Sequence, residues 1–469
     1  MSISKKTGSS LRGILILIVS LGLSLHSAAQ NDGARTLFAD NKAAILQIRI
    51  IDLTSGSKSA IGSGFVVNNS GLIATNYHVV QMAASEPDQY RIEYLSADGA
   101  TNSLSLVDVD VINDLALVKA DTEMLSVLPL AADEPPIGVP VYALGNPLDL
   151  GLTVVPGTYN GINRTGYHPR VHFTGSLNPG MSGGPTLNTA GQVVGINVST
   201  AGNQISFLVP VTALAHLIAE YTERAAGVAD IKQRIGQQLL ADQDKKFAQL
   251  LALEWPTLAL GDAVVADELS PFLKCWGGSN SSSPKAQFLS ADRTCRSEDN
   301  IYLNAKFNSG VIEHQFFWLQ ANKLNSLQFY AYYERMLSDF APGNRGTEKD
   351  LGGWECVSQF VAAEGSQFLA AEGSIFPAAE GSQFLADEGS QFIDAGSAAD
   401  SAIKDSRTTK VVFCSRAYKD YPGLYDILFL QGTVDDSRAA FVSHFTLAGV
   451  SQKNAKAYAR KFMGVSKWP

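Results

Sequence analysis

Apolar and polar residues alternate along much of the first half of the chain, a pattern typical of half-buried β-strands. Residues 62–67 and 72–75 are largely apolar, and residues 68–71 between them have the turn sequence Asn-Asn-Ser-Gly. Two short runs joined by such a turn predict a β-hairpin. Residues 115–119, Leu-Ala-Leu-Val-Lys, predict a further strand that is buried.

Helical spacing replaces this alternation in the middle of the chain. Apolar residues recur every three or four positions from about Ala226 to Leu253, and Pro256 follows them. This spacing predicts one or two amphipathic helices that stop before the proline. Their apolar face either packs against a neighbouring domain or joins copies of the chain into an oligomer. Another helix is expected near the C-terminus, from about Lys453 to Met463.

The region 257–469 indicates a separate α+β domain. Its segments 316–318 and 329–333 are dense in aromatic residues, which we expect to form a core rather than a ligand platform. All four cysteines lie in this region, and in an exported chain an even number of them favours disulfides. Three pairings are open. Sequential pairing is preferred because short loops close at lower entropic cost, and it joins Cys275 to Cys295 and Cys356 to Cys414.

An eight-residue repeat interrupts this domain over about residues 358–396. A Ser-x-Phe unit begins at residues 358, 366, 374, 382 and 390, with Ala-Ala-Glu-Gly-like spacers between the copies. An extended strand would place every Phe on one face, because eight is an even number. The regular Gly and Ala and the scarcity of branched residues argue against a packed core. We expect a flexible acidic loop, with a Phe-based docking array as the alternative.

Composition and the N-terminus indicate the compartment. The chain has 469 residues, 45% of them hydrophobic, which allows two or three domains. Its formal net charge of -9 argues against a nucleic-acid surface. Residues 1–29 combine basic residues, a short apolar run and the small residues Ser27-Ala28-Ala29. This predicts a secretory signal peptide cut after Ala29. An uncleaved anchor is the alternative, although the run is short for a membrane span.

Residues 178–185, Asn-Pro-Gly-Met-Ser-Gly-Gly-Pro, are the most informative stretch of the chain. They predict a nucleophile, Ser182, on a tight glycine turn, with the amides of Gly180 and Ser182 aimed at one point. Such an oxyanion hole stabilises the negative charge that develops on an attacked carbonyl. Met181 is a candidate third donor. A serine hydroxyl also needs a base, and that base needs a group that orients it.

His78, just after the predicted hairpin, and Asp114, just before the predicted strand, are the candidates for base and orienting acid. The order His78, Asp114, Ser182 is that of the trypsin-like double-barrel proteases. With Ala-Leu-Gly-Asn-Pro at 143–147 and Gly-Gln-Val-Val-Gly-Ile-Asn at 191–197, these motifs resemble the HtrA/DegP branch of the trypsin-like serine peptidases.

This resemblance covers roughly residues 35–220 and implies a double six-stranded β-barrel closed by a helix over about 211–220. A helical connector, 221–256, and the disulfide-bearing α+β domain would follow. The implied function is an exported serine endopeptidase, periplasmic or secreted, that hydrolyses unfolded or misfolded envelope proteins through an acyl-enzyme. We expect no cofactor. No His/Cys/Asp spacing indicates a metal site, and three other histidines are expected to be ordinary surface or core residues: His168, His172 and His216.

The residues around the turn bear on specificity and activation. The predicted pocket wall comprises Ser176, Leu177, Val198, Ser199, Thr200, Ile205 and Phe207. None of these residues is acidic, which argues against cleavage after Arg or Lys. Ile205 would leave room for small or medium aliphatic side chains, as in the resembled family. Trypsin-like zymogens carry an Asp at the position of Met181, so activation by cutting a new N-terminus is not expected. The resemblance implies that contacts order the activating loops instead.

The chain also departs from the family. Gly175 stands where an acid is usual, and no PDZ-type carboxylate-binding loop follows the protease region. The sequence therefore gives no support for substrate capture by a PDZ domain, for cage assembly or for fine loop regulation. It is compatible with a homo-oligomer. Two competing functions are a catalytically silent protease fold that acts as a binding or chaperone-like protein, and a C-terminal binding module that positions the protease.

Overall fold

The computed structural model describes residues 33–202, 204–224, 227–338, 340, 344–362, 408–435 and 437–468. The chain divides into two compact units. The first consists of the described residues up to Arg164 and of His168–Ile231, and the second of Thr165–Tyr167 and the described residues after Ile231. The predicted signal peptide lies outside the described residues.

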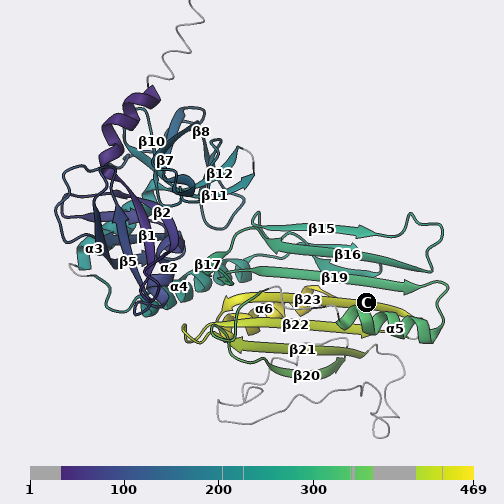
Figure 1. The fold of residues 1–469 in the computed structure, drawn as a ribbon. Coiled ribbons are helices and arrows are strands. Elements are labelled where there is room, and N and C mark those ends of the chain that lie inside the picture. Colours follow the sequence, from purple (N-terminus) through teal and green to yellow (C-terminus); the bar gives the residue numbers. More distant parts are fainter. Residues whose placement is uncertain are drawn as a thin grey trace, which may run out of the picture. The chain divides into compact units, whose positions relative to one another are not determined.

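Two closed antiparallel barrels of six strands each form the first unit, which confirms the expected fold (Figure 1). The first barrel has the order β1-β2-β3-β6-β5-β4, with bounds Ile45–Asp52, Lys58–Val66, Leu72–Thr75, Tyr90–Leu95, Thr101–Asp110 and Leu115–Lys119 for β1 to β6. The second has the order β10-β11-β12-β9-β8-β7, with bounds Pro140–Gly145, Thr153–Asn163, Arg170–Phe173, Pro185–Leu187, Val193–Gly202 and Ile205–Pro210 for β7 to β12.

A shared apolar core holds the two barrels together. It contains Phe65 and Leu117 from the first barrel and Leu144 and Val209 from the second, all fully buried. Leu214 of helix α3 (Val211–Arg224) joins the same cluster, so the expected helix after the second barrel is confirmed. The short helix α2 (Tyr77–Ser85) follows β3, and the 3-10 turn η2 (Pro147–Asp149) follows β7. These junctions carry the candidate site.

An antiparallel sheet of seven strands dominates the second unit (Figure 1). Its order is β15-β16-β19-β23-β22-β21-β20, with bounds Leu273–Ser279, Phe288–Ser297, Ile312–Ala321, Ala439–Val450, Tyr425–Val434, Thr408–Ala417 and Glu355–Ala362 in that order. Two small hairpins accompany it: β13 (Thr257–Leu260) with β14 (Ala263–Ala266), and β17 (Ile301–Asn304) with β18 (Phe307–Ser309).

Helices α4 (Ile231–Ala252), α5 (Ser326–Ser338) and α6 (Gln452–Val465) complete this unit, and the predictions of the first and last of them are confirmed. Phe247 and Leu250 of α4 are buried in the core of the second unit, so the apolar face of α4 packs within its own domain. The aromatic segments also contribute to the core, since Phe316 and Phe329 are buried, although Tyr330 is 50% exposed.

Both disulfides have the preferred pairing. Cys275 is bonded to Cys295 across β15 and β16, and Cys356 to Cys414 across β20 and β21. The first Ser-Gln-Phe unit of the repeat, residues 358–360, lies in β20 rather than in a loop. The other four copies fall within 363–407, outside the described residues.

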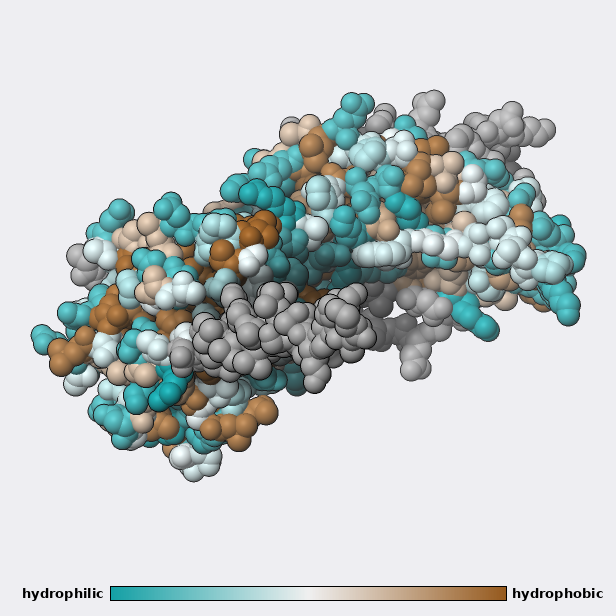
Figure 2. All heavy atoms as spheres, turned by 90° about the horizontal axis from the view of Figure 1, so that it is seen from above, coloured by the Kyte–Doolittle hydropathy of each residue, from teal (hydrophilic) through white to brown (hydrophobic). Residues whose placement is uncertain are grey.

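One face of the described chain is mixed in polarity. On the face that Figure 2 shows, hydrophobic residues lie scattered among hydrophilic ones. Of the helices within the described residues, none combines the length and the apolar composition that a membrane crossing requires.

Candidate active site

Asp114 and His78 form a tightly coupled pair at the mouth of the first barrel. Asp114 precedes β6 in a left-handed conformation, with φ 61°, and His78 lies in the first turn of α2. One carboxylate oxygen, Oδ1, accepts the His78 backbone N–H at 2.9 Å. The other, Oδ2, lies 2.6 Å from His78 Nδ1. Because a carboxylate only accepts, it favours the tautomer with hydrogen on Nδ1 and leaves Nε2 as the basic nitrogen.

The pKa of His78 follows from this environment. Burial lowers the pKa, but the negative charge of Asp114 and its hydrogen bond together outweigh burial and raise the pKa above its ordinary value of 6.5. A nearby carboxylate stabilises the imidazolium that a general base becomes when it takes a proton.

Ser182 stands on the turn between β9 and β10, where two glycines are required. Gly180 and Gly183 have φ of 96° and 83°, which side-chain-bearing residues rarely adopt. A Cβ on Gly183 would lie 2.4 Å from Thr75 Oγ1 and 2.9 Å from the backbone nitrogen of Asn76. The turn therefore packs directly against the segment that leads into His78. The Ser182 hydroxyl donates to the Val198 carbonyl at 3.4 Å, near the long limit for a hydrogen bond.

The backbone amides of this turn fall into two sets. Met181 N–H donates to Asn178 O at 3.0 Å, Gly183 N–H to Asn197 O at 2.9 Å and Gly184 N–H to Met181 O at 3.1 Å. Within the described part of the chain, the amides of Gly180 and Ser182 have no acceptor. The amide of Met181, the candidate third donor, already has an acceptor.

Buried side chains from outside the turn hold it in place. Ser63 of β2 donates its N–H to Ser182 O and its hydroxyl to Gly180 O, both at 2.8 Å. Asn197 of β11 donates its side-chain amide to Met181 O at 3.3 Å. Both side chains are fully buried. The sequence alone indicates no role for either residue, because its spacing gives no sign that a first-barrel serine reaches the turn.

The residues of the predicted pocket wall lie on the segments flanking the turn. Leu177 is buried and its N–H donates to the Ser206 hydroxyl at 3.2 Å, whereas Ile205 is 45% exposed. Phe207 pairs across strands with His172, with ring centroids 6.3 Å apart. The remaining wall residues are exposed or half-buried: Ser176, Val198, Ser199 and Thr200. Met181 is fully buried in the apolar core of the second barrel.

The other histidines take varied positions. His168 is buried, and the side chain of His216 is 74% exposed beside Glu220. Among the residues that the structure describes, no group of three or more His, Cys, Asp or Glu side chains is placed to hold a metal ion.

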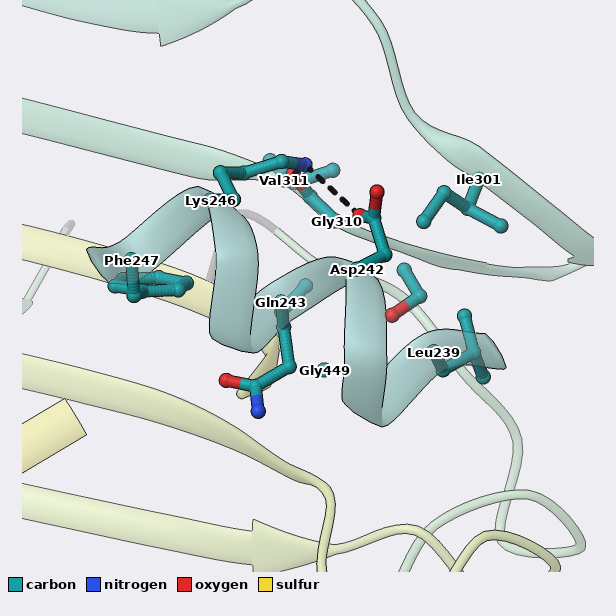
Figure 3. A pocket seen from close by; sticks show the side chains of 11 residues that line it. Leu239, Asp242, Gln243, Lys246, Phe247, Ile301, Gly310, Val311 and Gly449 are labelled. Atoms are coloured by element: carbon teal, nitrogen blue, oxygen red, sulfur yellow. Dashed lines mark hydrogen bonds and ion pairs between the residues drawn. The ribbon is translucent and has the colours of Figure 1, made fainter. Parts of the chain in front are cut away.

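A small cavity lies inside the second unit, between α4 and the ends of β18 and β23 (Figure 3). Lys246 and Asp242 point toward one another there, with Nζ and Oδ2 3.7 Å apart, and the Lys246 side chain is only 4% exposed. The cavity volume of about 10 Å³ suits one water molecule, so it is too small for a substrate.

The double barrel, the His–Asp pair and the glycine-framed serine define a trypsin-like peptidase domain. Residues 62–196 match the family model described as "Trypsin-like peptidase domain". The first unit is thus an HtrA-like, trypsin-like protease domain, as the sequence predicted.

Relatives with this domain include the serine protease HTRA1B of Danio rerio, 36% identical over 194 residues, which are 39% of this chain and 39% of the relative. A probable periplasmic serine endoprotease, DegP-like, of Halomonas elongata is 36% identical over 148 residues, 30% of each chain. The chain thus spans well under half the length of these relatives. Among solved structures, the serine endoprotease of Yersinia pestis matches at 28% identity and a TM-score of 0.37, covering 41% of this chain and 68% of that one.

Proposed function

We propose that the chain is a serine endopeptidase in which His78, Asp114 and Ser182 form the catalytic triad. His78 Nε2 takes the hydroxyl proton as the Ser182 oxygen attacks the peptide carbonyl. The same proton then passes to the leaving amine as the peptide bond breaks and an acyl-enzyme remains. Water, deprotonated by His78, hydrolyses the ester and regenerates the hydroxyl. Asp114 orients the imidazole and stabilises its charged form.

The observation that carries this proposal is the division of the amides in the turn. Gly180 and Ser182 keep their N–H groups unengaged within the described chain, while the amides of Met181, Gly183 and Gly184 are bonded internally. Two unengaged amides flanking a nucleophile are what an oxyanion hole requires. A turn with a merely structural role would gain stability by pairing them.

The substrate proposed is an unfolded or misfolded protein of the cell envelope, cleaved after small or medium aliphatic side chains. The DegP-like relatives named periplasmic support the compartment. The pocket wall supports the specificity, because none of its seven residues is acidic. Dominant cleavage of a peptide library after Arg, Lys or Phe would refute the specificity without touching the triad.

The test is hydrolysis of an unfolded protein by the purified chain. Ser182→Ala is expected to lower turnover by about a millionfold. Ser105→Ala is the matched control, because Ser105 is an exposed serine of β5 that lies outside both the proposed triad and the predicted pocket wall. Equal turnover by Ser182→Ala and the wild type would disprove the proposal. A wild type without turnover would favour the binding or chaperone-like alternative.

A further inference from the structure

We propose that Asp149 is a positioning residue for the oxyanion hole: it anchors the loop 146–150 to the first barrel, and this loop aims the Gly180 amide. The proposal rests on the proposed function, because it assigns a task at that same site to a residue outside the triad.

The first link joins the loop to the Gly180 amide. Leu148 N–H donates to the Pro179 carbonyl at 2.9 Å. The C=O and N–H of one trans peptide point in opposite directions, so the carbonyl held by Leu148 directs the Gly180 N–H to the other side. The loop also lies directly against Gly180, where a Cβ would come within 2.4 Å of Asn146 O and 3.1 Å of Leu148 N. A shift of the loop would therefore displace the Gly180 amide, the proposed oxyanion donor.

The loop does not favour this conformation by itself. Leu148 and Asp149 are two consecutive non-glycine residues with positive φ, 50° and 63°. Such a conformation persists only where surrounding contacts enforce it. Burial within the loop is confined to Asn146 and Pro147, which precede these two residues, whereas Leu148 is 59% and Leu150 79% exposed.

The Asp149 side chain supplies contacts that enforce the conformation. Its Oδ1 accepts from Gln47 Nε2 of β1 at 2.8 Å, and its Oδ2 pairs with Lys58 Nζ at the start of β2. Arg49 Nε donates to Gln47 Oε1 at 2.8 Å, which leaves the Gln47 amide hydrogens for Asp149. The hydrogen bonds from Lys58 and then from Gln47 lower the pKa of Asp149, so the carboxylate is charged at neutral pH.

Substitution of Asp149 should lower kcat and spare KM, because oxyanion donors act mainly on the transition state. For Asp149→Asn and Asp149→Ala, kcat is expected to fall about five- to tenfold, with KM within about twofold of wild type. Asp149→Gly relieves the positive φ and still removes the anchor, so it should lose kcat as well. Lys232→Met is the control: it removes an equally exposed ion pair, with Asp420, that belongs to the second unit, and it should leave kcat unchanged.

Two further measurements separate an anchor from a general loss of stability. The side chains of Lys58 and Asp149 are 41% and 43% exposed, so salt screens their pairing. Wild-type kcat should fall as salt rises, whereas kcat of Asp149→Ala should not. Lys58→Met should reduce kcat like Asp149→Asn, and the double variant should lose little more than either single one. Full additivity, or kcat equal to wild type in Asp149→Ala, would overturn the proposal.

Hydrogen exchange decides the proposal without any turnover. In a Ser182→Ala background, Asp149→Ala should accelerate exchange of the Leu148 amide and of the amides of residues 180–182. Unchanged exchange would overturn the anchor even in an active enzyme. Conversely, a wild type that neither hydrolyses protein nor reacts at Ser182 would refute the proposed function, while the exchange result would still stand on its own.

Discussion

Asp114 engages His78 through both of its carboxylate oxygens, one at the backbone N–H and one at the ring. The residue could be selected from the sequence, because an acid stands directly before a buried strand and in the right chain order. The left-handed backbone of Asp114 and its two contacts with His78 could not be predicted from the sequence, since both depend on how α2 and β6 meet in the folded domain. The same holds for Ser63, whose hydroxyl and N–H reach residues more than a hundred positions away in the chain.

The pKa of His78 gives a prediction at this scale. Turnover needs the neutral imidazole, so kcat/KM should rise with pH, with a midpoint above the ordinary 6.5 because Asp114 raises the pKa. Titration of His78 by NMR in Ser182→Ala should give the same midpoint. A midpoint below 6.5 would contradict the assigned pair.

Asp114→Asn tests the origin of that shift. The substitution removes the two contributions that raise the pKa and leaves burial, which lowers it, so the His78 pKa should drop below its wild-type value. Turnover should fall about ten-thousandfold, because an amide no longer enforces the required tautomer. His216→Gln is the control, since the His216 side chain is 74% exposed. This substitution should leave both the His78 pKa and turnover unchanged.

The nucleophile turn depends on elements on either side of it. β2 contributes Ser63, β11 contributes Asn197, and the loop after β7 contributes Leu148. The local pattern predicted the hairpin, the strand after Asp114 and helices α4 and α6, because alternation and helical spacing are local signals, whereas α3 was expected from the family resemblance. Contacts between the turn and distant elements were not predictable, because they involve side chains whose own motifs look like ordinary strand residues.

Gly183→Ala is the prediction for this element. A Cβ there would lie 2.2 Å from the Ser63 carbonyl, in a conformation with φ 83° that alanine disfavours. Hydrolysis and probe labelling at Ser182 should fall by at least about a hundredfold, because the turn must shift to relieve the contact. Gly99→Ala is a control, since Gly99 also has positive φ, 91°, and a Cβ added to it would meet nothing within 4 Å. Wild-type rates in Gly183→Ala would contradict the turn geometry.

At the scale of the whole chain, the second unit was predictable only in outline. The α+β class, the cysteine pairing and the C-terminal helix followed from local spacing. The strand order did not, because β19 pairs with β23, matching Ile312 to Leu447 and Gln320 to Ala439 across a long intervening segment. Such long-range pairing leaves no trace in periodicity. This unit also contains all five tryptophans of the chain, so its unfolding can be followed by their fluorescence.

Two buried histidines should make this unit sensitive to acid. Burial lowers the pKa of His314 to about 3, with His444 adding to the effect, and burial lowers the pKa of His444 to about 4. In the unfolded chain both histidines have pKa values of about 6.5. At a pH between the folded and the unfolded pKa values, the unfolded state therefore binds more protons than the folded state. The stability that depends on keeping these histidines neutral should be fully present above about pH 6.5 and should be lost as the pH falls toward about 4. For His444 alone, the loss in the free energy of unfolding should be about 3 kcal/mol.

Urea unfolding followed by tryptophan fluorescence measures this dependence. His444→Gln should flatten the fall in unfolding free energy between about pH 6.5 and 4, because one of the two groups no longer titrates. His216→Gln should leave the slope unchanged, since that residue belongs to the first unit and is exposed. A slope in His444→Gln equal to that of the wild type would show that His444 is not the titrating group.

The most direct measurement of the central claim is the reaction of the whole chain with a fluorophosphonate, which phosphonylates only an activated serine. Peptide mass spectrometry should place the adduct on Ser182, with labelling lost in His78→Ala and retained in Ser105→Ala, a change at an exposed serine of β5. Absence of an adduct on Ser182 in the folded wild-type chain, under conditions where a reference serine protease is fully labelled, would contradict the account.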